Sequence, residues 1–451
     1  MRKLIAFVLV LTGFAAFGQQ PDSTMIAKVY TEALASSESY DHLRYLCKEI
    51  GHRLSGSSSL DEAIAWGAEV LKNYGADSVY LQPVVVPHWS RGTTAEASYT
   101  SGLKTGALHI TALGGSIPTN GVVEGEVIEV KHIEELEKLG RKAIEGKIVL
   151  FNRAMDPLLI NTGAAYGGAY DQRSDGASAA GAYGAKAVLV RSLTHAQDTF
   201  PHTGGMEYKA GVDQIPAAAI STVDANLLHT LLSEGERVHV QMEMDCIKYE
   251  DREQANVIAE WRGEEIPEEI IVLGGHLDSW DIGEGAHDDG AGIAHTIEVL
   301  RLLKAMNYKP RRTLRFVLFI NEENGNNGGE TYAEVAKQRG EIHHAAIESD
   351  AGGFTPRGYN TECGDELYSK LRHFVSDLED YGIHQARRGW SGVDIRPLKD
   401  QTTNLFGFIP DGQRYFDYHH SNRDVFEMVN PRELALGSAS LAVLMVFLDM
   451  Q

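Results

Sequence analysis

The chain has 451 residues, 43% of them hydrophobic and 23% charged, a composition typical of a folded protein and a length sufficient for two or three domains. Its formal net charge of −22 disfavours nucleic acid and anionic membrane surfaces as partners. The three cysteines, Cys47, Cys246 and Cys363, are too widely spaced for a metal motif, so they form either one disulfide with a thiol left over or three buried thiols.

The N-terminus has the three parts of a secretory signal peptide. A basic start, Met1-Arg2-Lys3, precedes an apolar run over residues 4–17 and then Gly18-Gln19-Gln20. The run is short for a membrane span of about 20 residues, and no later stretch is predicted to be long and apolar enough to cross a membrane. The sequence therefore predicts a signal peptide over residues 1–19 and an exported protein, periplasmic or secreted.

The segment that follows is predicted to be helical and then extended. Apolar residues recur at helical spacing over residues 23–74, and Gly51 and Gly75 are stop signals. Two short strands, 79–81 and 84–86, are expected next, separated by Pro83. We assign residues 20–113 to the first part of the main domain.

Residues 114–245 differ in composition from the rest of the chain. They are rich in glycine and alanine, with short apolar strands and one helix at 176–184. Residues 161–170 are predicted to be a Gly/Ala/Tyr loop, without the fingerprint of a phosphate-binding loop. This stretch is predicted to be an inserted β-rich domain with its own sheet.

From residue 246 onwards the chain returns to the main domain, where strands and helices alternate. Strands are expected at 270–273, 313–320, 344–348 and 405–408, and helices at 292–306, 330–339, 366–378 and 433–448. The strands are almost continuously apolar, as in sheets buried on both faces. The fold class predicted is α/β, with a largely parallel sheet covered by helices on both sides.

Histidines and carboxylates follow several of these strands. They are His276, Asp278 and Asp288 after the first, Glu322 and Glu323 after the second, Asp350 after the third, and His419 and His420 near the C-terminus. Open α/β sheets place their active sites at the carboxyl ends of strands. Each motif alone is common in proteins without a metal, but together they predict a metal centre. Mixed imidazole and carboxylate ligands suit zinc better than magnesium or calcium.

Five ordered motifs carry a resemblance to a known family: Gly275-His276-Leu277-Asp278-Ser279, Gly285-Ala286-His287-Asp288-Asp289-Gly290, Glu322-Glu323, Ser349-Asp350 and His420-Ser421. They resemble the signature of the co-catalytic di-zinc aminopeptidases and carboxypeptidases, a family that includes the glutamate carboxypeptidases and the transferrin receptor. The inserted region resembles a protease-associated domain at residues 145–150, 180–182 and 215–217. The resemblance covers nearly all of the chain after residue 20, and it implies a three-layer αβα peptidase domain.

The resemblance also implies a set of roles. Asp288 would bridge two zinc ions. His276 and Asp350 would complete one zinc site, and Glu323 and His420 would complete the other. Glu322 would be the general base, and Asp278 would orient the ligand imidazole. The Asp288–Asp289 peptide is typically cis in this family.

Some positions depart from the family pattern. His287 precedes the bridging aspartate, and we expect it neither to bind metal nor to contact substrate. His419, beside the ligand His420, is a candidate for substrate or oxyanion binding. Asp394 either shapes the specificity pocket or caps a loop. The segment 324–329 replaces the commoner sequence after the glutamate doublet.

The function implied by the resemblance is hydrolysis of dipeptides or short peptides by an exported di-zinc carboxypeptidase or dipeptidase. A broad aminopeptidase on the same centre is the main alternative. A glutaminyl-cyclase-like transferase and a non-catalytic receptor-like protein are remoter, since no metal ligand is missing. A homodimer is expected from resemblance only.

Overall fold

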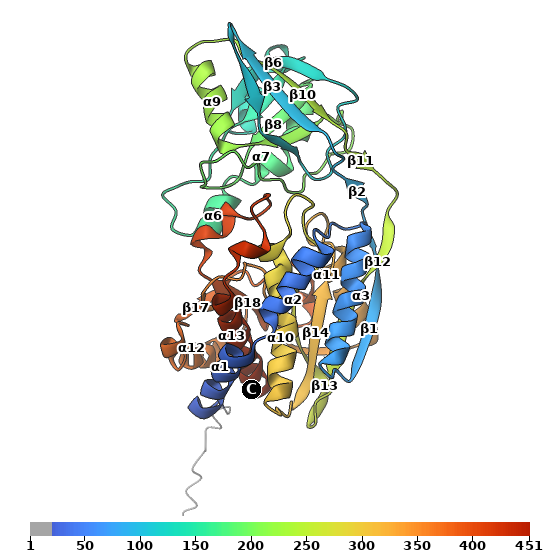
Figure 1. The fold of residues 1–451 in the computed structure, drawn as a ribbon, viewed down its shortest axis with the longest axis vertical. Coiled ribbons are helices and arrows are strands. Elements are labelled where there is room, and N and C mark those ends of the chain that lie inside the picture. Colours follow the sequence, from blue (N-terminus) through green and yellow to red (C-terminus); the bar gives the residue numbers. More distant parts are fainter. Residues whose placement is uncertain (1–19) are drawn as a thin grey trace, which may run out of the picture.

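The structure is a computed structural model that describes residues 20–451; the predicted signal peptide, residues 1–19, lies outside the described residues. Two eight-stranded sheets organise the chain, and they lie at opposite ends of the long axis of the molecule (Figure 1).

The main sheet is mixed, with a parallel centre. Its strand order is β1 (Ser78–Val86), β12 (Arg252–Trp261), β14 (Arg312–Phe319), β13 (Ile266–His276), β15 (Ile342–Glu348), β18 (Leu405–Pro410), β16 (Pro356–Thr361) and β17 (Gln385–Arg388). The neighbours β14, β13, β15 and β18 run parallel to one another, while β12 and β16 pair antiparallel with the two ends of this group. The α/β class and the mostly parallel sheet are therefore confirmed.

Helices cover both faces of this sheet, because its central strands are apolar on both sides. Alternate residues of a strand point to opposite faces: Ile271 and Leu273 of β13 pack into the larger core, and Ile270 and Val272 into the smaller one. The larger core is covered by α1 (Ser23–Ser36), α3 (Ser58–Asn73), α10 (Ala291–Ala305), α12 (Asp365–Ser376) and α13 (Pro431–Asp449), with α2 (Ser39–Tyr45) against α10, and the smaller by α11 (Asn327–Arg339). The result is three layers.

Pro83 does not break the strand in which it lies, contrary to the prediction. β1 is continuous from Ser78 to Val86, with Pro83 opposite Ala255 of β12. β1 is the edge strand of the sheet, and an edge strand tolerates a residue without an N–H donor.

The last helix is long and apolar enough to span a membrane by length and composition, contrary to the prediction. α13 has a mean hydropathy of 1.4 over an 18-residue window, 78% of which is buried inside the protein. It packs against α1 and α10, so in this fold it is a core helix.

The second sheet carries the inserted part of the chain. Its order is β4 (Lys104–Leu108), β3 (Ala95–Ser101), β10 (His239–Met244), β6 (Val123–Val130), β7 (Ile148–Phe151), β8 (Ala187–Arg191), β9 (Ala217–Ile220) and β5 (Ile110–Ala112), and its helices are α4 (Glu134–Leu139), α5 (Arg141–Ile144), α6 (Thr162–Gly167), α7 (Asp171–Ser174), α8 (Gly176–Gly181) and α9 (Thr222–Ser233). The sheet begins at Ala95, before the change in composition at residue 114. The resemblance to a protease-associated domain stays a prediction.

One further prediction changes in detail, and the structure decides between two alternatives for the cysteines. The expected loop 161–170 contains the helix α6, which begins where the Asn161 side chain accepts a hydrogen bond from the backbone N–H of Ala164. All three cysteines are free and buried, which agrees with the second of the two alternatives.

Candidate metal centre

Three neighbouring parallel strands place the predicted site residues at one edge of the main sheet. His276 is the last residue of β13. Glu322 and Glu323 follow the end of β14, and Asp350 follows the end of β15. Since the sheet order is β14, β13, β15, these side chains converge although they are far apart in sequence.

Asp288 lies at the middle of the cluster and faces a histidine with each carboxylate oxygen. Its Oδ1 is 3.2 Å from His276 Nε2, and its Oδ2 is 3.2 Å from His420 Nε2. On the two flanks, Asp350 Oδ1 is 3.6 Å from His276 Nε2, and Glu323 Oε2 is 3.0 Å from His420 Nε2. The structure thus brings all five predicted metal ligands together, with Asp288 between two groups.

The donor atoms of this cluster are suited to hold metal ions. Four of them are buried and have no hydrogen-bond partner among the described residues: His276 Nε2, Asp288 Oδ2, Glu323 Oε2 and Asp350 Oδ1. Buried polar atoms without partners are costly, and bound cations would satisfy them. The His420 ring has the matching orientation, since its Nδ1 lies 3.2 Å from the Thr203 carbonyl oxygen and Nε2 is left for a metal.

Asp278 holds the glutamate doublet more directly than the ligand imidazole. Its carboxylate accepts the backbone N–H groups of Glu322 and Glu323, at 3.2 and 3.3 Å. His276 Nδ1 lies 3.0 Å from the Asp278 backbone carbonyl oxygen and 3.7 Å from its carboxylate. The carbonyl therefore orients the imidazole, and the carboxylate fixes the backbone of the doublet.

Two buried residues that the sequence analysis missed fix the loop between His276 and Asp288. The Arg53 guanidinium donates to the carbonyl oxygens of Leu277, Glu284 and Gly285 at 2.7–3.0 Å. Asp424 accepts the backbone N–H groups of residues 287 and 288, at 2.7 and 3.1 Å. Both lie far from the loop in sequence, so no local pattern indicates their roles.

Glu322 has the surroundings of a general base. Its side chain lines the cavities on both sides of the cluster, whereas the neighbouring Glu323 contacts the His420 imidazole. Burial raises the pKa of the Glu322 carboxyl well above its usual range; His276 opposes this shift, and the charges of Asp350 and Glu323 add to it. A bound cation would lower this pKa again, which leaves a carboxylate able to accept and return a proton.

His287 and Asp289 have structural positions. The His287 ring stacks on Phe354 at 4.2 Å, and its Nδ1 accepts the backbone N–H of Gly353. Asp289 accepts the backbone N–H groups of His276 and Gly292. The Asp288–Asp289 peptide bond is cis, as the resemblance implied.

The two candidates for substrate contact have different positions. The His419 ring stacks on His420 at 3.5 Å, with its Nε2 3.6 Å from Asp288 Oδ2, so it faces the centre and joins one candidate metal group. Asp394 is fully buried and lines neither cavity. Burial raises the pKa of its carboxyl well above the usual range, and the charge of Glu348 adds to the shift. A substrate contact of Asp394 has no support from this position.

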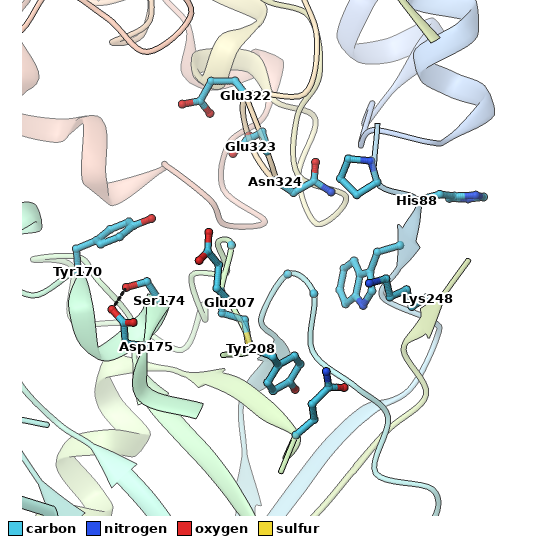
Figure 2. Close-up of a pocket in the computed structure, with 18 residues that line it drawn as sticks. His88, Tyr170, Ser174, Asp175, Glu207, Tyr208, Lys248, Glu322, Glu323 and Asn324 are labelled. Carbon is cyan, nitrogen blue, oxygen red and sulfur yellow. Dashed lines mark hydrogen bonds between the residues drawn. The ribbon is translucent and has the colours of Figure 1, made fainter. Parts of the chain in front are cut away.

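Two cavities meet at the glutamate doublet. One, of about 610 Å³, has polar and apolar lining residues and includes His88, Glu207 and Lys248 (Figure 2). The other, of about 680 Å³, lies over the predicted metal ligands. It is lined by aromatic residues of the inserted part of the chain and of the main domain: Tyr166, Tyr170, Trp390, Phe408, Tyr415 and Phe416. A peptide whose scissile bond lies at the cluster would extend into both cavities.

Arg173 of α7 is a further residue of this site that the sequence analysis missed. It lines the aromatic cavity, is 4% exposed, and packs over the Tyr170 ring at 4.8 Å. One of its terminal nitrogens (NH1) lies 3.4 Å from His420 Nδ1. Its Nε has no hydrogen-bond partner, and no carboxylate pairs with it among residues 20–451. An unpaired buried cation beside the centre suits an anionic group of a ligand.

Comparison with known proteins gives consistent matches. The family model of peptidase family M28 matches residues 256–444. Carboxypeptidase Q of Bos taurus is 35% identical over 431 residues, which cover 95% of this chain and 88% of that protein. The crystal structure of a peptidase M28 precursor from Shewanella amazonensis matches with a TM-score of 0.90 at 34% identity, over 94% of this chain and 96% of that one. A zinc aminopeptidase from Bacillus subtilis shares the fold, with a TM-score of 0.65 at 18% identity, over 92% and 95% of the two chains.

Proposed function

The chain belongs to peptidase family M28 and is a metallo-exopeptidase, and from this premise we propose that it is an exported di-zinc enzyme that hydrolyses dipeptides or short peptides with a free C-terminal carboxylate. The ligands would be His276 and Asp350 on one ion, Glu323 and His420 on the other, and Asp288 on both. Bound zinc would supply Lewis-acid activation of a water molecule and of the scissile carbonyl group.

Glu322 is the proton carrier in this proposal. Its carboxylate accepts a proton from the attacking water and later donates it to the nitrogen of the leaving amine. Asp278 acts through the backbone, because it holds the N–H groups of both glutamates and so fixes where Glu322 points. His420 keeps its orientation through Thr203.

The position of the Arg173 side chain is the observation that favours cleavage of the peptide bond next to a C-terminus. A buried guanidinium is stabilised by a carboxylate that binds it with charge-assisted hydrogen bonds. Asp288, Glu322, Glu323 and Asp350 line the same cavity, but among the described residues no carboxylate pairs with Arg173. A substrate whose C-terminal carboxylate reaches Arg173 would place its last peptide bond near Asp288. The similarity to carboxypeptidase Q supports the same assignment.

The test is a set of dipeptides with free and blocked ends, assayed with the purified protein while its metal content is measured. We expect hydrolysis of free and N-acetylated dipeptides, loss of activity on C-terminal amides, and two zinc ions per chain. The opposite preference for blocked ends would assign an aminopeptidase instead. Metal-loaded protein without peptidase activity would refute the proposed function.

Export and dimerisation complete the proposal. The basic, apolar and small-residue order of residues 1–19 supports a cleaved signal peptide, and mass measurement of the protein isolated from its natural host would test it. The homodimer rests on resemblance, and light scattering would test it.

A further inference from the structure

The cavity of about 610 Å³ beside the glutamate doublet contains a carboxylate whose function is not yet assigned. Glu207 belongs to the inserted part of the chain, and it lines this cavity together with Glu322 and Glu323 (Figure 2). Figure 2 shows the Glu207 carboxylate directed towards the side of the cavity that carries the doublet. The inserted part of the chain therefore places a negative charge opposite the proposed proton carrier.

Contacts of the neighbouring backbone fix the position of Glu207. Its backbone N–H donates to the Ser174 carbonyl oxygen at 3.1 Å. The hydroxyl of the next residue, Tyr208, donates to a backbone carbonyl oxygen at 2.7 Å. Two residues earlier, Gly205 packs on the doublet, since a Cβ at Gly205 would lie 3.3 Å from the Glu323 carbonyl oxygen. The segment that carries Glu207 is thus held against the metal-binding loops.

The Glu207 carboxylate forms no hydrogen bond and no ion pair with any of residues 20–451. Asp175, the other carboxylate that the inserted part contributes to this cavity, is paired with Lys209 at 2.6 Å. Lys248 also lines the cavity, but Figure 2 shows it apart from Glu207. Burial lowers the pKa of the His88 imidazole, so this ring is neutral at pH 7. The negative charge of Glu207 is therefore available to a cation from outside the protein.

The position of the cavity indicates which part of a substrate faces Glu207. In the proposed function the C-terminal residue of the substrate lies with Arg173 in the aromatic cavity, so the residue before the scissile bond extends into the cavity of Glu207. The α-amino group of that residue is attached to the carbon next to the scissile carbonyl and therefore stays beside the metal ligands. A lysine or arginine side chain is long enough to cross the cavity and reach a carboxylate on its far side.

We propose that Glu207 is a specificity-determining residue that binds the positive charge of a lysine or arginine side chain on the substrate residue before the scissile bond. This inference rests on the proposed function and gives it a substrate class, peptides with a basic residue before the bond that is cut. Glu207 is exposed, so the contact is partly open to solvent and its effect is moderate. Since the basic side chain takes no part in the reaction, it is bound equally in the ground state and the transition state, and the effect is mainly on KM.

The test uses two dipeptides, arginyl-phenylalanine and citrullyl-phenylalanine, because citrulline keeps the length and shape of arginine without its charge. For the wild-type protein we expect kcat/KM to be about fivefold to tenfold higher for the arginyl dipeptide, between the effects of an exposed ion pair and of a buried charged hydrogen bond. Glu207→Gln should remove this difference through KM, with zinc content unchanged and the rate on the citrullyl dipeptide changed less than twofold. Glu207→Lys should reverse the preference and favour glutamyl-phenylalanine over glutaminyl-phenylalanine.

Glu234→Gln is the matched control, because Glu234 is also exposed in the inserted part of the chain but lines neither cavity. A wild-type protein without activity on either dipeptide refutes the proposed function. An active wild type with less than a twofold preference for the arginyl dipeptide, or a Glu207→Gln variant that keeps the wild-type preference, overturns the assignment of Glu207. A Glu207→Gln variant that loses activity equally on both dipeptides also overturns it, and N-acetylated dipeptides then tell whether the carboxylate binds the α-ammonium group or acts only on packing.

Discussion

Substituting Arg173 by methionine separates recognition of the substrate terminus from the chemistry. Methionine keeps most of the side-chain length and removes the charge. The buried guanidinium has an unbonded Nε and no carboxylate partner among the described residues. Hydrogen bonds to a charged group contribute about 1.5–3 kcal/mol, and each 1.4 kcal/mol corresponds to about tenfold. We therefore expect kcat/KM on a dipeptide to fall about 10–150-fold.

The assay measures kcat/KM for a dipeptide and for its C-terminal amide. The amide has no C-terminal carboxylate for Arg173 to bind, so the Arg173→Met substitution should change the already low rate of amide hydrolysis less than threefold. Stability should not fall, because the substitution removes an unpaired buried charge. Arg191→Met is the matched control: Arg191 is also buried, with an unbonded Nε and no carboxylate partner among the described residues, but it donates to the side chains of Asn152 and Asn226 and lines neither cavity. An equal loss on acid and amide would refute the assignment of Arg173.

Glu322→Gln should lower kcat by about 10²–10⁴-fold while metal analysis still finds the bound zinc; activity near the wild-type value would refute its role as proton carrier. Removing zinc with a chelator should lower both activity and the melting temperature, because buried carboxylates lose their counter-charges, and added zinc should restore both; an unchanged melting temperature would contradict a buried centre. Burial lowers the pKa of His295 to about 3. The folded state therefore binds fewer protons than the unfolded one below pH 6.5, and stability falls as the pH falls. At about 1.4 kcal/mol per pKa unit, this residue should cost about 2 kcal/mol between pH 7 and pH 5. Urea unfolding should show a weaker pH dependence for His295→Gln, and an identical one would contradict the shift.

The main sheet could be predicted because its strands are apolar along their whole length. All residues of β14 are buried, which is the pattern of a strand covered on both faces. Three of the predicted metal ligands, His276, Glu323 and Asp350, lie at or just after the ends of such strands, so their convergence could also be expected. The continuity of β1 through Pro83 could not be foreseen, since it depends on β1 being an edge strand, and that depends on the whole sheet.

Arg173 and Tyr415 were beyond sequence reasoning for a different reason. Arg173 lies in the short helix α7 and Tyr415 in the 3-10 helix η5 (Gly412–Asp417), and neither residue is unusual in its local sequence. Among residues 20–451, no carboxylate pairs with Arg173, which donates only to the Thr203 carbonyl oxygen and lies beside His420, and the Tyr415 hydroxyl makes no hydrogen bond; only coordinates reveal this. Arg53 and Asp424 are similar: their partners are backbone groups distant in sequence. Asp394 is the opposite case: its sequence motif suggested a role in the specificity pocket, but its side chain is fully buried.

The main sheet and the inserted part of the chain contribute different residues to the site, and this bears on how the specificity of such enzymes diversifies. Glu322, the proposed proton carrier, and most of the predicted metal ligands lie at or after strands of the main sheet, whereas Arg173 and Tyr170 reach the same cavity from the inserted part of the chain. If Arg173 binds the substrate terminus as proposed, mutations in the inserted part of the chain would change which peptide end is bound and leave Glu322 and the predicted metal ligands of the main sheet unaltered. An exchange of inserted units between relatives would be a direct route to altered specificity.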